Sequence, residues 1–331
     1  MDMWTSGKVP FAQKRKFPVR DMRASPAGRL FCRLPAVCPR GPFRCDRLNA
    51  RCDGVSGSQS QIIDPGLLLL AYRSGIFPMA DARDDPEIYW VEPRLRGILP
   101  LDGFHCSHSL ARTLRRGRFE VTCDTAFAQV LAACAAPRPG LEPDDPDDPD
   151  DETAGTWISE RIEATYLALH ARGQAHSVEC WQTGADGARA LVGGLYGVGF
   201  DRVFCGESMF SRVPDASKVA LAWLVAALRL GGVELLDCQF MTGHLASMGA
   251  VEISQSDYLG RLHRAQRNEQ DDQSGCAGAG AGAASGAGAS AGAGAALSLP
   301  EAFGALLATA KSCGLSSSPG KLIAQSFTHT S

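Results

Sequence analysis

Apolar positions in the middle of the chain fall into runs separated by glycine, proline and polar residues, and these runs predict its helices. Asp64-Pro65 is a favourable helix start and Gly75 a favourable stop, so we expect a short helix over residues 67–73. A second helix is expected over residues 160–172, because Ser159 can cap its first turn. This second helix leads directly into a series of strands.

The strands are expected over residues 177–182, 191–197, 202–205 and 233–237. Between the last two lies an expected helix over residues 217–230, with Asp215 as its cap, which is apolar nearly all round and therefore buried. Strands in this order with one crossover helix form a mixed sheet. That order is the general layout of acetyltransferase-like N-acyltransferases, and it predicts a mixed α/β (α+β) fold.

Composition sets both ends of the chain apart from this middle part. Up to Arg51 the chain is rich in Arg and Lys and poor in acids, which fits an organelle transit segment or sequence translated from a start codon placed too early. The segment 275–296 is almost wholly Gly, Ala and Ser, as in a linker. The later apolar cluster of Leu322, Ile323 and Phe327 suggests a tail that docks on the body.

The domains expected are a basic extension over 1–58, a small N-terminal domain over 59–153 with an acidic loop at 141–153, a catalytic domain over 154–268, a linker over 269–300 and a C-terminal tail over 301–331.

Charge and cysteine content narrow the protein classes. The net charge of −3 hides an acidic body, because the basic extension offsets a run of Asp and Pro that reads as a solvated loop. The 12 cysteines lie mostly inside apolar runs, as reduced buried thiols do, and lack the paired spacing of a zinc site, so no metal is expected. No stretch is long and apolar enough to span a membrane. We expect a cytoplasmic protein, unless residues 1–55 are a genuine transit segment.

Two short blocks place polar side chains inside apolar runs and carry the candidate chemistry. Glu207 lies between Phe204 and Met209, where a carboxylate is tolerated only if it is paired, protonated or bound to a cationic ligand. Asp237 and Gln239 stand two apart on the expected strand, so they share a face and both can meet one ligand. The plainer alternatives are a carboxylate satisfied by backbone N–H groups for Glu207 and a turn cap for Asp237.

These blocks, with others around them, resemble the leucyl/phenylalanyl-tRNA–protein transferase family, most of all its alphaproteobacterial branch. The likeness runs from about residue 62 to about residue 266. The matching motifs are Leu70-Ala71-Tyr72, Gly75-Ile76-Phe77-Pro78, Gly155-Thr156-Trp157-Ile158, His176-Ser177, Gly193-Gly194-Leu195-Tyr196-Gly197, the run 204–211, Ala216-Ser217-Lys218 and Asp237-Cys238-Gln239. So many ordered matches are hard to obtain by chance. The resemblance implies an acetyltransferase-like catalytic domain behind a smaller N-terminal domain.

The resemblance also implies an aminoacyltransferase that needs no cofactor. It would take Leu, Phe or Met from aminoacyl-tRNA and join it to the N-terminal α-amine of proteins that begin with Arg or Lys, which marks them for N-end-rule degradation. The amine has a pKa of about 7.7 to 8.0 and the ester is activated, so positioning can supply much of the rate. In this interpretation Gln239 hydrogen-bonds the amine, while Asp237 orients Gln239 and helps to take up the proton.

Binding roles follow from the same resemblance. Glu207 would meet the cationic side chain of the acceptor, and Trp157 would stack on the terminal adenine of the tRNA. Met79 stands where many family members carry Trp, so one aromatic contact would be missing. The site for the transferred amino acid would use Leu195, Phe204, Met209, Ser211, Leu224 and Leu236. Contacts to phosphates of the acceptor stem would come from Arg94, Arg96, Arg112, Arg115, Arg116 and Arg118.

Three other functions remain open on the residues alone. An acyl-CoA-dependent N-acyltransferase would use the glycine-rich run 194–199 as its phosphate loop, although a strand follows and small residues in a strand turn are the plainer interpretation. A thiol hydrolase would use Cys238 with His244 and Asp237, although Cys238 points to the opposite strand face. A non-catalytic module that binds aminoacyl-tRNA or N-degrons would not need Asp237 and Gln239 together.

Overall fold

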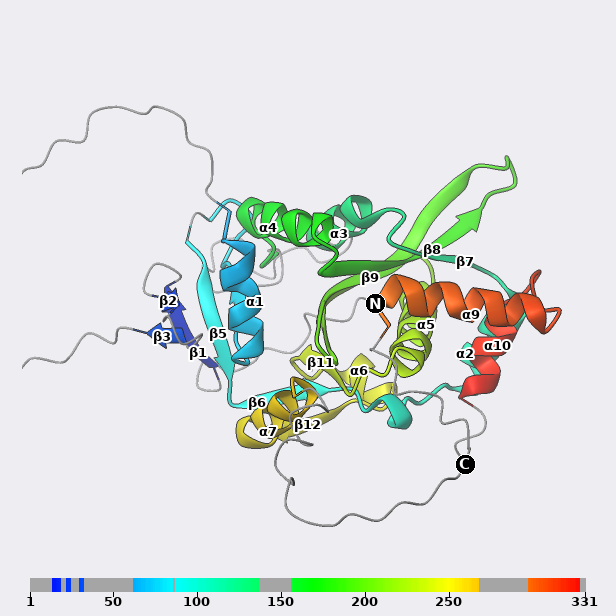
Figure 1. The fold of residues 1–331 in the computed structure, drawn as a ribbon. Helices are drawn as coiled ribbons and strands as arrows, with labels where there is room; N and C mark the ends of the chain where they lie inside the picture. The colour runs from blue at the N-terminus through cyan, green and yellow to red at the C-terminus, as the bar shows by residue number, and fades with distance from the viewer. Residues whose placement is uncertain are drawn as a thin grey trace, which may run out of the picture.

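The computed structural model describes residues 62–85, 87–136, 156–267 and 297–327, together with the backbone of three short strands nearer the N-terminus (Figure 1). Its elements are β1 (Lys14–Pro18), β2 (Met22–Ala24), β3 (Leu30–Cys32), α1 (Pro65–Arg73), β4 (Phe77–Met79), β5 (Tyr89–Pro93), β6 (Leu95–Ile98), η3 (Leu101–Gly103), α2 (His108–Arg116), β7 (Glu120–Cys123), α3 (Phe127–Ala135), α4 (Glu160–Ala171), β8 (Ala175–Thr183), β9 (Arg189–Phe200), β10 (Val203–Ser211), α5 (Ala216–Leu230), β11 (Leu235–Gln239), α6 (Gly243–Ser247), β12 (Val251–Ser254), α7 (Gln255–Ala265), α9 (Leu299–Ser312) and α10 (Gly320–Ser326). The acidic loop expected at 141–153 and the Gly/Ala/Ser run 275–296 lie outside the described residues.

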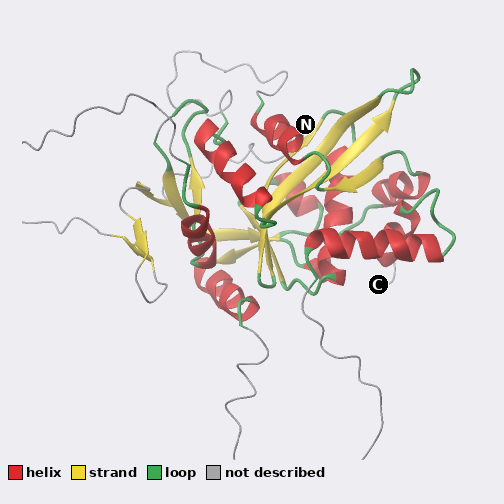
Figure 2. Ribbon diagram, turned by 45° about the horizontal axis from the view of Figure 1, so that its top comes forward, coloured by secondary structure: helices red, strands yellow, loops and turns green. Residues whose placement is uncertain are grey.

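A seven-stranded sheet in the order β12-β6-β11-β10-β9-β8-β7 organises the molecule. The pair β10 and β11 is parallel and the other neighbours are antiparallel, so the sheet is mixed, as the order of elements predicted. One apolar cluster joins the sheet to α2, α5, α9 and α10, and a second joins it to α1, α3, α4 and α7 (Figures 1 and 2). None of the described helices is both long and apolar enough to cross a membrane.

The helix starts show how local chemistry sets the elements. Asp64 caps α1, because its carboxylate accepts a hydrogen bond of 2.9 Å from the N–H of Leu67, and the Ser159 hydroxyl caps α4 in the same way. The expectation for Asp215 is wrong. Its φ of 72° puts it in the left-handed region, its side chain caps nothing, and its carboxylate instead accepts a hydrogen bond of 3.3 Å from the hydroxyl of Thr113.

Two strands are longer than predicted, and the extra length matters for the candidate chemistry. β10 continues to Ser211, so Glu207 lies inside a strand and not in a loop after it. The glycine-rich run 194–199 lies inside β9, which pairs with β10 and β8 and offers no helix N-terminus to a phosphate. A Cβ atom at Gly197 would overlap the ring of Phe204, so this glycine lets the ring lie flat on β9. The run is therefore no phosphate loop, but it also does not form the expected strand turn, because it lies within β9 and the turn follows at residues 201 and 202.

The larger sheet contains strands from both sides of the domain boundary that the sequence predicted between residues 153 and 154. Strands β6 and β7 come from before that boundary, yet β6 pairs with β11 and β12, and β7 pairs with β8. Ahead of them, β4 and β5 form a small sheet with β1, whose residues 14–18 fall inside the expected basic extension and run antiparallel to β5. Strands β6 and β7 thus join the larger sheet by pairing with β11 and β8, whereas β4 and β5 stay in the small sheet.

The C-terminal tail packs on the body, as its apolar cluster suggested. Helix α9 lies across α5, where the rings of Phe303 and Trp223 have centroids 5.0 Å apart, and α10 lies beside α2 (Figure 1). The approach of α10 is close, since a Cβ atom at Gly320 would overlap the carbonyl oxygen of Leu114. The tail therefore covers the side of α5 that the sheet leaves free.

Candidate active site

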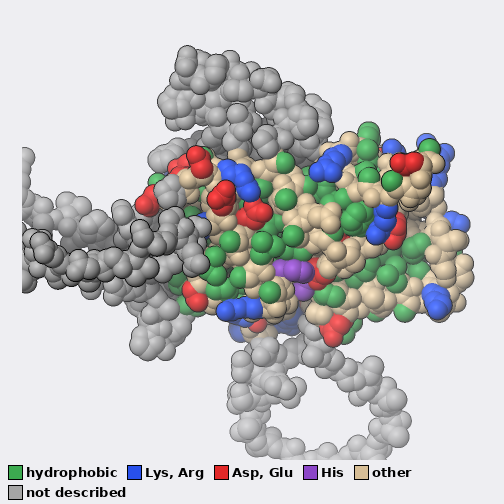
Figure 3. All heavy atoms as spheres, turned by 90° about the horizontal axis from the view of Figure 1, so that it is seen from above, with side chains coloured by type: hydrophobic (Ala, Val, Ile, Leu, Met, Phe, Trp, Pro, Cys, Tyr) green, Lys and Arg blue, Asp and Glu red, His purple; other side chains and the backbone are tan. Residues whose placement is uncertain are grey.

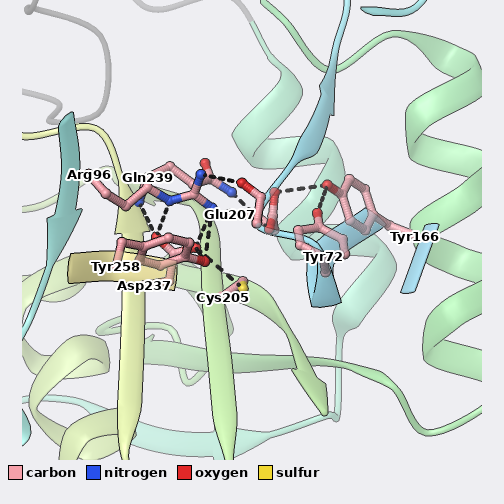
Figure 4. A network of polar contacts seen from close by, with 9 residues as sticks. Tyr72, Arg96, Tyr166, Cys205, Glu207, Asp237, Gln239 and Tyr258 are labelled. Carbon is pink, nitrogen blue, oxygen red and sulfur yellow. Dashed lines mark hydrogen bonds and ion pairs between the residues drawn. The ribbon is translucent and has the colours of Figure 1, made fainter. Parts of the chain in front are cut away.

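The parallel strands β10 and β11 part in the middle of the sheet. They pair only through Val203–Cys205 and Leu235–Asp237; beyond this point β10 continues with β9, and β11 turns to β6. Each strand has a register shift just past the point of parting. There Gln239 on β11 reaches across to Glu207 on β10, and its amide nitrogen donates a hydrogen bond of 2.9 Å to Oε1 (Figure 4).

Glu207 is completely buried, and both of its oxygens are hydrogen-bonded to side chains. Oε2 accepts a bond of 2.8 Å from the hydroxyl of Tyr166, and the hydroxyl of Tyr72 lies 2.6 Å from that of Tyr166 (Figure 4). Burial raises the pKa of Glu207 to about 7, although the bonds from Gln239, Tyr166 and Tyr72 oppose this rise. Among the described residues no cation and no backbone N–H satisfies this carboxylate, unlike in the plainer alternative considered for it.

Asp237 is also buried, but it has a cationic partner. Its Oδ1 accepts bonds from Nε of Arg96 at 2.9 Å and from the backbone N–H of Gln239 at 2.8 Å. Its Oδ2 accepts bonds from Nη2 of Arg96 at 2.6 Å and from the hydroxyl of Tyr258 at 2.9 Å (Figure 4). Asp237 thus caps the backbone N–H of Gln239, as the plainer alternative expected, and its orienting role in catalysis stays a prediction.

The expectation that Arg96 contacts tRNA phosphates is wrong. Its side chain is 2% exposed, and the guanidinium lies over the rings of Phe77 and Tyr258 at 4.8 and 4.3 Å and donates to the carbonyl of Gly75. Burial is the largest single influence and lowers the pKa of Arg96, but the charge and hydrogen bonds of Asp237 together with Tyr258 and Cys205 outweigh it and raise the pKa above its usual value. The ion pair with buried Asp237 compensates the charge of Arg96 and holds its side chain inside the protein.

Gln239 departs from ordinary strand geometry. Its φ of 61° lies in the left-handed region, so the simple alternation that put Asp237 and Gln239 on one face does not hold through the register shift. The backbone around Phe240 passes close to β6, where a Cβ atom at Gly97 would lie 3.0 Å from Phe240. Within the described part of the chain the amide oxygen of Gln239 accepts no hydrogen bond. It is the free acceptor of the site.

The apolar residues expected around the transferred amino acid come together on the α5 side of the sheet. Phe204 pairs with Leu236 across β10 and β11, and Met209 pairs with Leu195 across β10 and β9. Leu224 of α5 belongs to the same buried cluster. Burial in this cluster also fits ordinary core residues, so their contact with substrate stays a prediction.

The other residues expected to bind substrate lie in two places. The hydroxyl of Ser211, at the end of β10, donates to the carbonyl of Val213 and accepts from the N–H of Ser217. Trp157 and Met79 are both half-buried on the α1 side, and the N–H next to Met79, on Ala80, donates to the carbonyl of Trp157. The structure therefore brings together the two positions expected near the tRNA end.

The remaining arginines expected to contact tRNA are exposed. Arg112, Arg115 and Arg116 lie on α2 beside the tail, and Arg94 precedes β6. On the face shown in Figure 3, basic side chains are spread among acidic and apolar ones and form no single stripe. Their contact with tRNA stays a prediction.

The alternative thiol site does not assemble. Cys238 is buried in the cluster on the α5 side, and burial raises the pKa of its thiol well above the usual value, with Asp237 adding to the rise. Burial also lowers the pKa of His244 to about 4. Within the described residues Cys238 and His244 share no hydrogen bond, and no three metal-binding side chains lie together.

The sequence reasoning missed the tyrosines. Tyr72, Tyr166 and Tyr258 come from α1, α4 and α7, and their hydroxyls converge on the two buried carboxylates. A tyrosine inside an apolar helical run needs a partner for its hydroxyl, and that signal was available at Tyr72 and Tyr166. Arg96, between Leu95 and Ile98 of β6, carried the same kind of signal.

Comparisons with known proteins show which sequences this chain is similar to. A sequence model described as "Leucyl/phenylalanyl-tRNA protein transferase" matches residues 98–263, and one for the N-terminal domain of that family matches residues 62–94. The chain is similar to three proteins named leucyl/phenylalanyl-tRNA–protein transferase. That of Novosphingobium aromaticivorans is 59% identical over 283 residues, which cover 84% of this chain and 100% of the relative. Those of Rhizorhabdus wittichii and Zymomonas mobilis are 57% and 55% identical, over 60% and 62% of this chain and 74% and 70% of the relatives.

Proposed function

This chain belongs to the leucyl/phenylalanyl-tRNA protein transferase family, and from that premise we propose how its residues join leucine or phenylalanine, taken from aminoacyl-tRNA, to the N-terminal Arg or Lys of a protein. In this reaction the α-amine attacks the ester carbonyl. A C–N bond forms, the C–O bond to the terminal ribose breaks, the amine loses a proton and the ribose hydroxyl gains one. Methionine is a further donor that a pocket lined by Leu and Met side chains would accept.

One observation carries the catalytic proposal: Glu207 binds the amide nitrogen of Gln239, which leaves the amide oxygen as the free acceptor. An acceptor oxygen takes a hydrogen bond from an amine N–H and thereby directs the nitrogen lone pair away from itself, toward the ester carbon. A donor at this position would bind the lone pair and block attack. Gln239 is therefore the catalytic residue that touches the amine.

Asp237 acts on Gln239 and not on the proton. Both of its oxygens already accept hydrogen bonds from Arg96, from the hydroxyl of Tyr258 and from the N–H of Gln239, which leaves the amine no free oxygen on Asp237. We therefore assign Asp237 to orientation and withdraw the expected role in proton uptake. Glu207 belongs to the acceptor side of the site through its bond to Gln239. Each oxygen of Glu207 accepts one of these two bonds, from Gln239 or from Tyr166, and keeps a lone pair with which it could also meet the acceptor cation.

The parting of β10 and β11 supports an acetyltransferase-like site. The apolar set with Phe204 and Met209 lies on the α5 side of the sheet, and Glu207 lies with Tyr166 on the opposite side. A donor side chain seated against α5 and an acceptor arriving from the α4 side would meet where the strands part. Trp157, near Met79, would hold the terminal adenosine, and exposed arginines such as Arg94 would contact the acceptor stem.

The test is a transfer assay with labelled Leu-tRNA or Phe-tRNA and peptides that differ only in the first residue. We expect label on peptides that begin with Arg or Lys and little on peptides that begin with Ala or Asp. A chain that binds the aminoacyl-tRNA but labels no peptide would be the non-catalytic binding module, and the proposal would be wrong. Transfer from acetyl-CoA would instead support the N-acyltransferase alternative.

A further inference from the structure

Two buried tyrosines stand behind the carboxylate that fixes Gln239. Tyr166 reaches Glu207 from α4, and Tyr72 reaches Tyr166 from α1, so hydroxyls from two helices end on one carboxylate oxygen. Both rings are buried, and Tyr72 and Tyr166 are outside the set of residues to which the motifs gave a role. The chain of bonds runs from Tyr72 through Tyr166 and Glu207 to Gln239 (Figure 4).

The direction of each bond follows from donor and acceptor capacity. An ionised carboxylate only accepts, so Tyr166 must donate to Glu207, and Tyr72 must then donate to Tyr166. If Glu207 takes up a proton on Oε2, both hydroxyls can turn round, because a hydroxyl donates and accepts equally well. Oε1 stays an acceptor for Gln239 in either case. The tyrosine pair thus confines a proton to the oxygen that faces away from Gln239.

Without the Tyr166 hydroxyl this confinement is lost. Glu207 would then lose the hydroxyl bonded to Oε2 at 2.8 Å and keep only the weaker contribution of Tyr72, so a proton could settle on Oε1 instead. A protonated Oε1 would donate to the Gln239 amide, so the amide would turn its oxygen toward Glu207 and its NH2 group toward the acceptor amine. That orientation offers a donor to the attacking lone pair and stops the reaction.

We propose that Tyr166, with Tyr72 behind it, is a positioning residue that keeps Glu207 aligned so that the amide oxygen of Gln239 faces the acceptor amine. This inference rests on the proposed function, since it needs Gln239 at the reacting amine. It extends the site to helices α1 and α4, which provide no group that touches the substrate in the proposed reaction. The Glu207 pKa of about 7 places this effect within the working pH range.

The fold supplies a matched control in Tyr196. Its ring packs edge-on against Tyr166 at a centroid distance of 5.3 Å, and it is equally buried. Its hydroxyl, however, has no hydrogen-bond partner among the described residues. Tyr196→Phe therefore removes the same atom from the same core without touching the chain of bonds.

The experiment measures single-turnover transfer from Phe-tRNA to an Arg-initiated peptide by the full chain and by Tyr166→Phe, Tyr72→Phe and Tyr196→Phe, between about pH 6 and pH 8.5. The ratio of variant to wild-type rate cancels the titration of the acceptor amine, which all proteins share. Loss of a bond that favours the ionised carboxylate raises its pKa. The wild type keeps the Gln239 amide oriented in either protonation state, whereas Tyr166→Phe keeps it only while Glu207 is ionised. With a pKa of about 7 or above, roughly a tenth or less of the variant carboxyls are ionised at pH 6, so we expect the Tyr166→Phe ratio to be ~10-fold lower at the low end of the range than at the high end.

Tyr72→Phe should change in the same direction by less, Tyr196→Phe should keep a flat ratio near one, and all four proteins should bind Phe-tRNA with the same Kd. A Tyr166→Phe ratio that is flat across pH, or that follows Tyr196→Phe, overturns the positioning role while wild-type transfer still supports the proposed function. If Tyr166→Phe does not fold, a flat ratio for Tyr72→Phe overturns it instead. A wild type that transfers nothing refutes the proposed function itself.

Discussion

The buried ion pair between Arg96 and Asp237 allows a sharp test of the site. Arg96→Met keeps the length of the side chain and removes its charge and its donors. Asp237 would then stay buried with only neutral partners, namely the hydroxyl of Tyr258, the N–H of Gln239 and the thiol of Cys205. Removing one partner of a buried pair costs about 3 to 5 kcal/mol, because the remaining charge is left uncompensated in a medium of low dielectric constant.

The matching change in melting temperature is large. A domain of this size loses roughly 2 to 4 °C per kcal/mol, so Arg96→Met should melt about 10 °C below the wild type in a calorimetric or circular-dichroism scan. Arg94→Met is the matched control, because Arg94 is exposed two residues earlier and its loss should change the unfolding free energy by less than about 0.5 kcal/mol. The double variant Arg96→Met with Asp237→Asn should regain part of the stability, since no charge remains unpaired, without regaining transfer.

The salt dependence of Phe-tRNA binding distinguishes an arginine that contacts tRNA phosphate from an arginine that is the buried partner of Asp237. Loss of a phosphate contact lowers the slope of log K against log salt by about 0.7 to 0.9, and we expect this for Arg94→Met and not for Arg96→Met. If Arg96→Met melted like the wild type and lowered the salt slope, Arg96 would be a phosphate contact and the buried pair would not exist in solution.

Three further outcomes follow from the structure. Glu207→Gln removes a carboxyl whose pKa is about 7 in the native state and near its usual ~4.5 in the unfolded chain. Between these two pKa values the native state binds more protons than the unfolded state, so the wild type loses at most ~3 kcal/mol of stability as pH rises from about 5 to 8. The melting temperature of Glu207→Gln relative to that of the wild type should therefore rise over this pH range. A constant difference between the two melting temperatures would contradict the raised pKa. Met209→Trp should slow transfer of Phe more than transfer of Leu, because the wider ring needs the volume first, whereas equal losses with a lower melting temperature would make Met209 a core residue. Gly320→Val should lower the melting temperature, since its side chain would meet the carbonyl of Leu114, and a variant truncated after residue 270 should melt lower still; unchanged melting of both would show that the tail is free.

Much of the fold could be predicted because local signals agree with it. The caps at Asp64 and Ser159, the glycine stops and the all-apolar helix at 217–230 each appear close to where the sequence placed them. The course of the early strands could not be predicted, because β6 and β7 join the larger sheet by pairing with strands more than 50 residues away. Short apolar runs carry no signal for such distant partners.

The candidate site was predicted as a set of residues but not as a set of contacts. The sequence singled out Glu207, Asp237 and Gln239, because polar groups inside apolar runs need an explanation. It did not predict that Asp237 holds Gln239 by the backbone, because that contact depends on the left-handed φ at Gln239 and on the register shift before it. It also assigned Arg96 to the surface, since an arginine near a strand end is usually solvated.

The two buried carboxylates show why similar burial leads to different roles. Asp237 has the guanidinium of Arg96 within 2.6 Å, so the two charges form a buried ion pair. Glu207 has only neutral donors, two tyrosine hydroxyls and one amide, so burial dominates and its proton equilibrium lies close to pH 7. The carboxylate with a cation anchors the backbone of Gln239. The carboxylate without one sets the orientation of the Gln239 amide, and because its pKa lies near 7, that orientation depends on the tyrosine hydroxyls that keep the proton on the far oxygen.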